Sequence, residues 1–320
     1  MPKISILVAV YNTAAYLPQC LDSLLSQTLK DIEVLCVDDA STDKSLEILH
    51  QYAEKDERVK VFALKENRGQ AHARNVGLSH ATGDYIGFVD SDDWLSRDAL
   101  EKVCESFRDD VDSVLFRVLY AYPDGRMRDY EMSPFTTMTG DEAFRASLTW
   151  QIHGCYVVRN SIHKAHPYDE SQRAYSDDNT TRIHYYYSRK VAFCEGIYYY
   201  RQQPVSVTRS VSVRRFDYLV ANESMRRQLL ALGASDENLR CYETIRWLNL
   251  VGVYMFYYLH RNELSEADRQ HGLSVMHHVW QTINLKQVNP SIKRKFGYIP
   301  LRFSWSLFCL QEEVYFWLRG

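Results

Sequence analysis

The sequence predicts an α/β protein whose sheet is mainly parallel, and three observations point to it. Short runs rich in Ile, Val and Leu alternate with helical segments through the first third of the chain. These runs are apolar along their whole length, as in strands that helices cover on both faces. Hydrophobic residues make up 46% of the 320 residues and charged residues 25%, which is ordinary for a globular protein with a large core.

Strands and helices are expected to alternate as far as residue 118. The expected strands are residues 4–10, 33–37, 59–63, 85–89 and 114–118. Apolar residues at helical spacing indicate helices within residues 17–25, 41–53, 69–81 and 99–107. The capping types Ser41, Thr42 and Asp43 support the start of the second helix. Strands separated by helices in this way imply parallel pairing.

The alternation loosens after residue 118. Residues 122–125, Tyr-Pro-Asp-Gly, predict a hairpin turn. Thr139 with Glu142 predicts a capping box before a short helix. Residues 155–159 and 191–194 read as further short strands.

A domain boundary is expected near residue 210, where the pattern becomes helical. We therefore expect one domain over residues 1–210 and a mainly helical extension over residues 211–320. Within the extension, residues 292–317 are first basic and then aromatic. Such a tail could lie on a membrane surface, pack onto the first domain or form a homodimer contact.

Charge and cysteine content exclude several classes of protein. The net charge is -3, so no global basic field would recruit nucleic acid. The seven cysteines are widely spaced and include no C-x-x-C pair, which argues against a disulfide framework or a zinc site. Met1 leads almost directly into the first strand, so no signal peptide is expected, and residues 248–259 are too short an apolar run to span a bilayer. We therefore expect a cytoplasmic protein.

The fourth expected strand ends in three carboxylates, Asp90, Asp92 and Asp93, with Ser91 among them. Ligands of parallel sheets usually bind at this edge, where the strands end. Carboxylates so close together repel one another unless a cation lies between them. Mg²⁺ and Mn²⁺ prefer oxygen ligands and often bind one or two carboxylates together with substrate phosphates. The segment therefore indicates a metal-assisted enzyme with a phosphorylated donor; the alternative is a solvated acidic turn that caps the next helix.

Polar residues also follow the first two strands. Tyr11 could stack on a base, and Asp38 or Asp39 could accept from a base N–H or from ribose hydroxyls. Arg74, in the third expected helix, could approach the nucleotide or its phosphates. Each residue alone has a structural alternative: an edge aromatic, a helix cap or a surface ion pair. Their convergence on one sheet edge favours a nucleotide site.

Together these segments resemble the family 2 glycosyltransferases of the GT-A fold, of the kind that builds bacterial polysaccharides. The matching residues are 5–12, 37–43, 67–69, 73–77 and 83–93, and the match is dense to about residue 110 and weaker to about residue 210. The resemblance implies that residues 1–210 form a GT-A catalytic domain. Its nucleotide-sugar half would be about residues 1–115 and its acceptor half about residues 116–210.

The resemblance also implies roles on the donor side. Tyr11 and Asp39 would hold the nucleobase, with Asn12 beside them and Asp38 or Arg74 nearby. Asp90, Ser91 and Asp92 would form the D-x-D motif, with Asp92 the main ligand of Mn²⁺ or Mg²⁺ and Asp90 directed toward the ribose and the metal. The cation would offset the charge of the diphosphate, most often that of a UDP-sugar.

An inverting transfer needs a base opposite the leaving group. The family usually supplies it from a Glu-Asp pair at the start of a helix, where this chain has Asp177 and Asp178. The motif aspartate corresponds to Asp178, which we favour, while Asp177 replaces the glutamate. An acidic pair that caps the helix is compatible with the same role. Trp150 and His153 would face the acceptor, although a lone histidine there is more often a structural hydrogen-bonding group.

Two later segments are also similar to the family. Residues 198–208 resemble a stretch that closes over the diphosphate, and a strand leading into a loop is the alternative. Residues 243–247 resemble the Q-x-x-R-W motif of processive members, but Glu243 replaces the glutamine. We take that likeness as chance and expect one sugar to be added per encounter.

The sequence thus favours an inverting, metal-dependent transferase acting on a glycan or lipid-linked acceptor in cell-surface polysaccharide synthesis. The tail suggests a location on the inner face of the membrane. A nucleotidyltransferase would want a basic, Gly-rich loop after the first strand, which residues 10–15 lack. A non-catalytic nucleotide-sugar or glycan-binding module would need no base, and a glycosidase would need no nucleotide-type strand ends.

Overall fold

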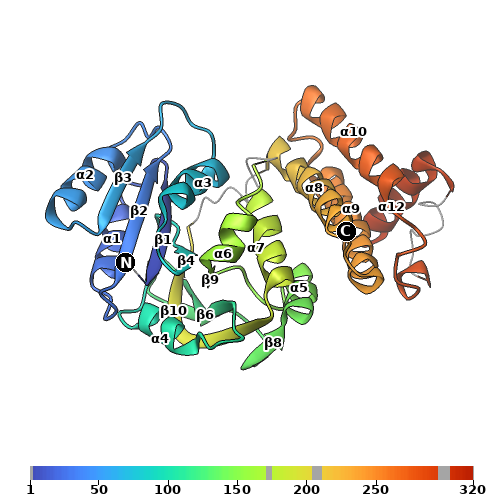
Figure 1. Cartoon of the computed structure of the whole chain (residues 1–320). Helices are drawn as coiled ribbons and strands as arrows, with labels where there is room; N and C mark the ends of the chain where they lie inside the picture. The colour runs from blue at the N-terminus through green and yellow to red at the C-terminus, as the bar shows by residue number, and fades with distance from the viewer. Residues whose placement is uncertain (1–2, 171–174, 204–210, 295–302, 320) are drawn as a thin grey trace. The chain divides into compact units, whose positions relative to one another are not determined.

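Figure 1 shows a computed structural model of the chain, which describes residues 3–170, 175–203, 211–294 and 303–319. The chain divides into two compact units, residues 1–204 and residues 205–320. No described helix is long and apolar enough to cross a membrane.

The first unit is built on a mixed sheet with the strand order β3-β2-β1-β4-β9-β6-β10-β5. The first four strands in this order are parallel, whereas β9 runs antiparallel to both β4 and β6. The strands are β1 (Ile4–Val10), β2 (Ile32–Asp38), β3 (Val59–Ala63), β4 (Tyr85–Phe88), β5 (Trp94–Leu95), β6 (Ser113–Ala121), β7 (Met127–Asp129), β8 (Thr137–Thr139), β9 (Tyr156–Arg159) and β10 (Lys190–Arg201). The predicted α/β sheet is therefore confirmed, and β10 extends well beyond the expected residues 191–194.

Helices cover both faces of this sheet because every strand near its centre is apolar on both sides. In β1, Ile6 and Val8 pack with α1 and α4, whereas Leu7 packs with α3. The helices of this unit are α1 (Leu17–Leu25), α2 (Ser45–Lys55), α3 (Gln70–His80), α4 (Ala99–Ser106), α5 (Gly140–Leu148), α6 (Asn160–Ala165) and α7 (Ser176–Tyr187).

Two local predictions in the first unit are confirmed. The turn after β6 makes a hairpin with β7, and Gly125 adopts a φ of 85°, which favours glycine. At the start of α5, Thr139 and Glu142 form the reciprocal capping box.

The second unit is helical, as predicted. Its elements are η1 (Val213–Phe216), α8 (Asp217–Ala231), α9 (Asp236–His260), α10 (Glu266–Thr282), η2 (Ile292–Arg294) and α12 (Trp305–Arg319). Its core gathers around the long helix α9, where Trp247, Leu250 and Tyr254 pack against Met276 of α10 and Phe308 of α12.

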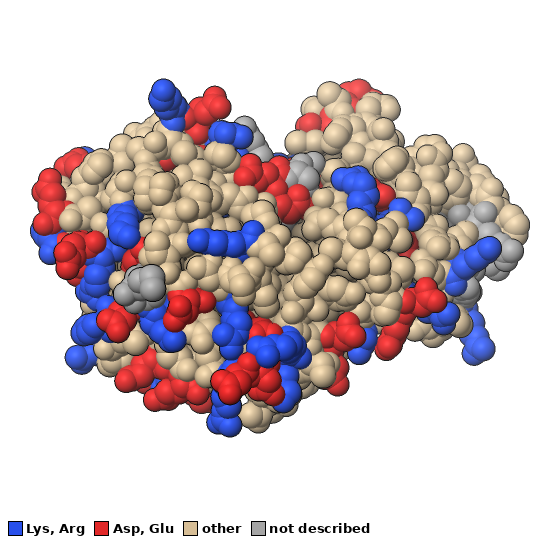
Figure 2. Space-filling view, in the orientation of Figure 1, with Lys and Arg blue, Asp and Glu red and all other residues tan. Residues whose placement is uncertain are grey.

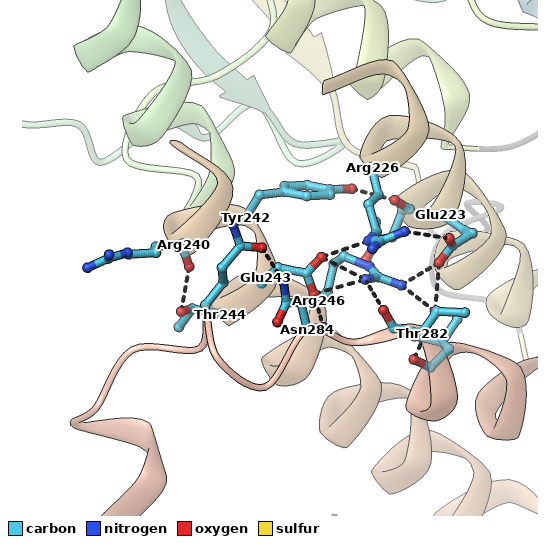
Figure 3. A network of polar contacts seen from close by, with 12 residues as sticks. Glu223, Arg226, Arg240, Tyr242, Glu243, Thr244, Arg246, Thr282 and Asn284 are labelled. Carbon is cyan, nitrogen blue, oxygen red and sulfur yellow. Dashed lines mark hydrogen bonds and ion pairs between the residues drawn. The ribbon is translucent and has the colours of Figure 1, made fainter. Parts of the chain in front are cut away.

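Figure 3 shows a buried network of charges in this unit, centred on Arg246. Arg246 Nη1 lies 2.9 Å from Glu243 Oε2, and Nη2 pairs with Glu223 and donates to Thr282 Oγ1 at 2.8 Å. Arg226 Nε completes the network at 2.8 Å from Glu243 Oε1, so two guanidinium groups balance two carboxylates. Removing one partner of such a network costs roughly 3–5 kcal/mol. The residues that resemble the processive motif thus join α8, α9 and α10.

Candidate active site

The carboxyl ends of β1, β2 and β4 lie at one edge of the sheet, as the alternation of strands and helices predicted. The register sets Val10 of β1 beside Asp38 of β2, and Leu7 beside Phe88 of β4. The loops that follow β1 and β2 are also joined, because the Asp39 backbone N–H donates to the Val10 carbonyl at 2.8 Å.

Asn12 holds the first two of these loops together. Its φ of 52° lies in the left-handed region, which asparagine tolerates better than most residues. Its Oδ1 accepts from the Thr42 backbone N–H at 2.8 Å, and its own N–H donates to Ser41 Oγ at 3.1 Å. The neighbouring Tyr11 is 48% exposed, so its ring is accessible to a flat ligand.

Asp38 and Asp39 are both buried, but they differ in their partners. Both oxygens of Asp39 are occupied, by the backbone N–H groups of Arg68 and Gly69, each at 2.8 Å. Asp38 Oδ2 accepts from the Ser41 N–H at 3.1 Å, while Oδ1 has no hydrogen-bond partner among the described residues. Buried carboxylate oxygens normally have a partner. The oxygen without a partner is therefore the buried Oδ1 of Asp38, whereas the resemblance assigned the nucleobase to Asp39.

The acidic triplet after β4 is divided between a structural residue and two more accessible ones. Asp93 is buried and accepts from Tyr198 Oη at 2.9 Å and from the Arg201 N–H at 2.7 Å. Asp90 Oδ1 accepts from Arg74, and Asp92 Oδ2 accepts from Gln203 Nε2 at 2.7 Å. Asp93 thus fixes the loop to β10, while Asp90 and Asp92 carry the remaining acceptor capacity.

Electrostatics at the triplet fit a cation held by two carboxylates. Burial, and then repulsion from Asp90, raises the pKa of Asp92 above its ordinary value. A divalent cation relieves both effects. Among the described residues no group of three or more His, Cys, Asp or Glu side chains is arranged to hold a metal. Two carboxylates are a donor set that Mg²⁺ and Mn²⁺ accept when substrate phosphates supply further oxygens.

Ser91 and the end of β10 fasten the triplet to its surroundings. Ser91 Oγ accepts from Thr13 Oγ1 at 3.0 Å, which joins the loops after β4 and β1. Arg201 Nε donates to the Asp92 carbonyl at 2.7 Å, and its guanidinium lies 4.6 Å from the centre of the Trp94 ring. These contacts place residues 198–203 against the D-x-D segment; residues 204–208 of the same stretch lie outside the described residues.

Arg74 of α3 is buried between two carboxylates, with 2% of its side chain exposed. Its Nη2 lies 2.6 Å from Asp90 Oδ1, and its Nη1 lies 3.5 Å from Asp177 Oδ2. Burial alone would lower the pKa of the guanidinium, but the attraction of Asp90 and Asp177 raises it. Arg74 is thus permanently charged and joins the strand-end carboxylates to α7.

Asp177 and Asp178 lie in the first turn of α7, after Tyr175, whose φ is 67°. Burial raises the pKa of Asp178 to about 7; Arg182, one turn further along the helix, opposes this shift, and Asp177 adds to it. Asp177 instead pairs with Arg74. A carboxyl group that titrates near neutrality suits a general base. The two neighbouring carboxylates therefore differ: Asp177 is ion-paired with Arg74, and Asp178 has a raised pKa.

Several residues that fix this site were not singled out from the sequence. Gln70 donates to Asp90 Oδ1 at 2.8 Å. Asn75 exchanges hydrogen bonds with the backbone of Tyr168 at 2.8 and 2.9 Å and donates to Glu170 Oε1 at 2.6 Å. Asn75 belongs to a segment that matches the family, and this was the only signal of its role.

The two residues expected to face the acceptor differ in exposure. Trp150 is 47% exposed, and its backbone φ of 58° lies in the left-handed region. The Arg182 guanidinium lies 5.6 Å from the centre of the Trp150 ring. His153 is buried, and its Nδ1 accepts from the Cys155 N–H at 3.2 Å. Burial lowers the pKa of His153 to about 4, so the ring is neutral near pH 7. The geometry of His153 is that of a structural hydrogen-bonding group, and Trp150 offers the accessible surface.

The chain is similar to known glycosyltransferases. Residues 5–166 match the model of the family described as Glycosyl transferase family 2. The chain is 52% identical over 102 residues to an uncharacterized glycosyltransferase of Haemophilus influenzae, covering 32% of this chain and 41% of that protein. It is 32% identical over 219 residues to the uncharacterized glycosyltransferase EpsJ of Bacillus subtilis, covering 65% of this chain and 63% of EpsJ. The chain thus spans less than two thirds of either relative.

A solved structure extends the likeness to the whole fold. Residues 1–349 of S. aureus TarS, crystallised with UDP-GlcNAc, superpose with a TM-score of 0.77 at 22% identity. The match covers 98% of this chain and 91% of that one. It confirms the GT-A fold that the sequence resemblance implied. Because the family model matches half of the chain, the conclusion is plain: the chain belongs to glycosyl transferase family 2.

Proposed function

We propose that this protein is an inverting, metal-dependent glycosyltransferase of bacterial cell-surface polysaccharide synthesis. It would move a sugar from a nucleotide diphosphate donor to a hydroxyl of a glycan or lipid-linked acceptor. The observation that carries the proposal is the half-buried Asp178 carboxyl, whose pKa is about 7. Its neighbour Asp177 is linked through Arg74 to the strand-end carboxylate of Asp90.

The donor side supports a uridine nucleotide. Tyr11 offers an exposed ring on which a base can stack. Asp38 Oδ1 is buried and has no partner among the described residues, so it would accept from an N–H such as the one uracil carries if the surrounding loops move to admit the base. The fold neighbour TarS was crystallised with UDP-GlcNAc, which favours the same nucleotide here.

Asp92, with Asp90, would hold Mn²⁺ or Mg²⁺, which offsets the charge that develops on the diphosphate as it leaves. Asp178 would accept the proton of the acceptor hydroxyl. The hydroxyl oxygen then bonds to the anomeric carbon, the bond from that carbon to the donor phosphate oxygen breaks, and the nucleoside diphosphate departs with the electron pair. Attack on the face opposite the phosphate inverts the anomeric centre.

Trp150 and Arg182 are the residues that we expect to contact the acceptor. An exposed indole provides a flat apolar face against which the C–H groups of a sugar ring can pack. Arg182 contacts that indole and also acts on the charge of Asp178, so acceptor and base would share one positioning residue. A lipid-linked acceptor would place the reaction at the inner face of the cell membrane.

Hydrolysis and binding of UDP-, GDP-, dTDP- and CMP-sugars, with Mn²⁺, Mg²⁺ or EDTA, test the proposal. We expect one UDP-sugar to bind only with metal, Asp92→Ala to lose that binding, and Asp178→Asn to keep binding but lose turnover. If donor binding is unchanged by removal of the metal and by Asp92→Ala, the acidic triplet is a structural turn and not a metal site. Full function in Asp178→Asn would favour a non-catalytic module, and release of pyrophosphate would indicate a nucleotidyltransferase.

A further inference from the structure

Helix α12 is apolar on two opposite faces. Phe308 and Phe316 are buried in the core of the second unit. The opposite face carries side chains that are mostly exposed, among them Leu310 at 60% and Trp317 at 73%. The members of this outer stripe are Leu307, Leu310, Val314, Trp317 and Leu318. At about 100° per residue they fall on one side of the helix, where a surface helix normally carries polar residues.

A second helix of the unit, α9, also has an exposed apolar face opposite its buried one. On α9, Leu248, Met255 and Leu259 are exposed, and their spacings of seven and four residues set them on one face. The opposite face of α9 is the one that packs in the core. Large apolar side chains gathered along helix faces mark an interaction surface.

The charge of this unit identifies the chemistry of the partner. Residues 205–320 carry 15 Lys and Arg against 10 Asp and Glu, whereas residues 1–204 carry 23 against 31, of 38 and 41 in the chain. In Figure 2 both signs of charge are mixed over the first unit, while broad uncharged areas cover the visible face of the second. A net positive unit inside a chain of net charge -3 favours contact with an anionic surface.

The acidic residues of α12 do not oppose such a contact. Glu312 points inward and is buried, and Glu313 pairs with Arg261 at 3.1 Å. Exposed arginines flank the helix, Arg294 before it and Arg319 at its end. The outer stripe is thus free of acidic side chains, and the described residues nearest to α12 in sequence include exposed arginines on both sides of it.

We infer that α12 lies on the surface of a membrane that contains anionic phospholipid, with its outer stripe inserted at the boundary of headgroups and acyl chains. Apolar insertion and attraction of basic side chains are the two contributions that hold an amphipathic helix at such an interface. A second copy of the chain is the less favourable occupant, because it would bring two units of the same net charge together. The contacts that favour membrane binding do not depend on the proposed function. Only the purpose given to that binding, which is access to a lipid-linked acceptor, rests on it.

Vesicle flotation of the full chain tests the inference, with phosphatidylcholine vesicles that contain or lack phosphatidylglycerol. We expect binding to the anionic vesicles, weakened by high salt. The double variant Leu310→Ser with Trp317→Ser should bind roughly tenfold more weakly or worse. Leu230→Ser, which removes a comparably exposed leucine from α8, is the matched control and should bind like wild type. Absence of wild-type binding, or equal binding by the double variant, would overturn the inference.

Further measurements distinguish insertion of α12 into the membrane from dimerisation and from failure of the proposed function. Brominated lipid should quench a part of the tryptophan emission that Trp317→Phe removes, and no difference between the two proteins would contradict insertion of α12. Light scattering that shows a dimer in wild type and a monomer in the double variant, without vesicle binding, would assign the stripe to a second copy. Donor hydrolysis, measured without vesicles, should be equal in the double variant and wild type. A protein that binds vesicles but acts on no donor would overturn only the proposed function.

Discussion

The guanidinium of Arg74 lies 2.6 Å from Asp90 and 3.5 Å from Asp177, and so connects the two halves of the site. Asp90 follows β4 on the donor side, whereas Asp177 begins α7 beside Asp178. The Arg74 guanidinium also lies 4.2 Å from the centre of the Phe88 ring, within the range of a cation–π contact. A single buried charge therefore joins the carboxylate that follows β4 to the helix that carries the candidate base.

Replacing Arg74 should damage both stability and catalysis. Arg74→Met leaves two carboxylates without their common partner, and we expect a loss of about 2–4 kcal/mol of unfolding free energy, since Asp177 remains partly hydrated. Urea denaturation measures the loss. Arg74→Lys keeps the charge but cannot reach both carboxylates, so it should recover part of the stability but little of the kcat. A change below about 0.5 kcal/mol in Arg74→Met would show that the bridge contributes nothing.

The pH dependence of turnover should report Asp178. The base must be ionised, so kcat should fall as pH drops through about 7, the value to which burial raises its pKa. Arg182 favours the carboxylate form, so Arg182→Gln should move the acid limb of the kcat profile to higher pH. Arg126→Gln, in the exposed hairpin turn, is the control. An acid limb that stays in place in Arg182→Gln, with only KM altered, would restrict Arg182 to its contact with Trp150.

Asp38 and Asp39 can be distinguished by paired substitutions. Asp38→Ala removes the buried acceptor that has no partner among the described residues, and we expect UDP affinity to fall roughly 10–100-fold, the value of a hydrogen bond to a charged group. Asp39→Ala frees the N–H groups of Arg68 and Gly69, and should mainly lower stability. Calorimetric titration with UDP and thermal unfolding measure the two effects. The reverse outcome, in which only Asp39→Ala loses affinity for UDP, would assign the nucleobase contact to Asp39.

Stability of the second unit should depend on Glu312. Its buried side chain has an Oε1 without a partner among the described residues, and burial raises its pKa from 4.5 to about 7. The folded state therefore holds this proton more tightly than the unfolded state, so stability should fall as pH rises from about 4.5 through 7. Glu312→Gln should match wild type below this window and exceed it by about 1–3 kcal/mol at about pH 8. Glu313→Gln, whose side chain is more exposed, should show no such step; a parallel pH profile in Glu312→Gln would refute the explanation.

The sequence alone determined which residues meet at the sheet edge. Apolar runs separated by helices favour a covered, parallel arrangement, and the carboxyl ends of parallel strands share one edge. The convergence of Tyr11, Asp38 and Asp90 therefore followed from local pattern. The capping box of Thr139 and the hairpin at Gly125 were equally local and were predicted.

Only the tertiary structure decided how those residues are partnered. Gln203 reaches Asp92 from 111 residues away, and Arg74 pairs with Asp177, contacts for which no local pattern exists. The continuity of β10 was likewise not local: a strand was expected at residues 191–194 and was the alternative for residues 198–208, and pairing with β5 and β6 joins the two into one strand. Short-range preferences place a side chain on a strand, a helix or a loop. Its ionisation and its free acceptors depend on burial and on charges brought close by the fold, which is why the pKa of Asp178 and the Asp38 oxygen without a partner among the described residues appear only in three dimensions.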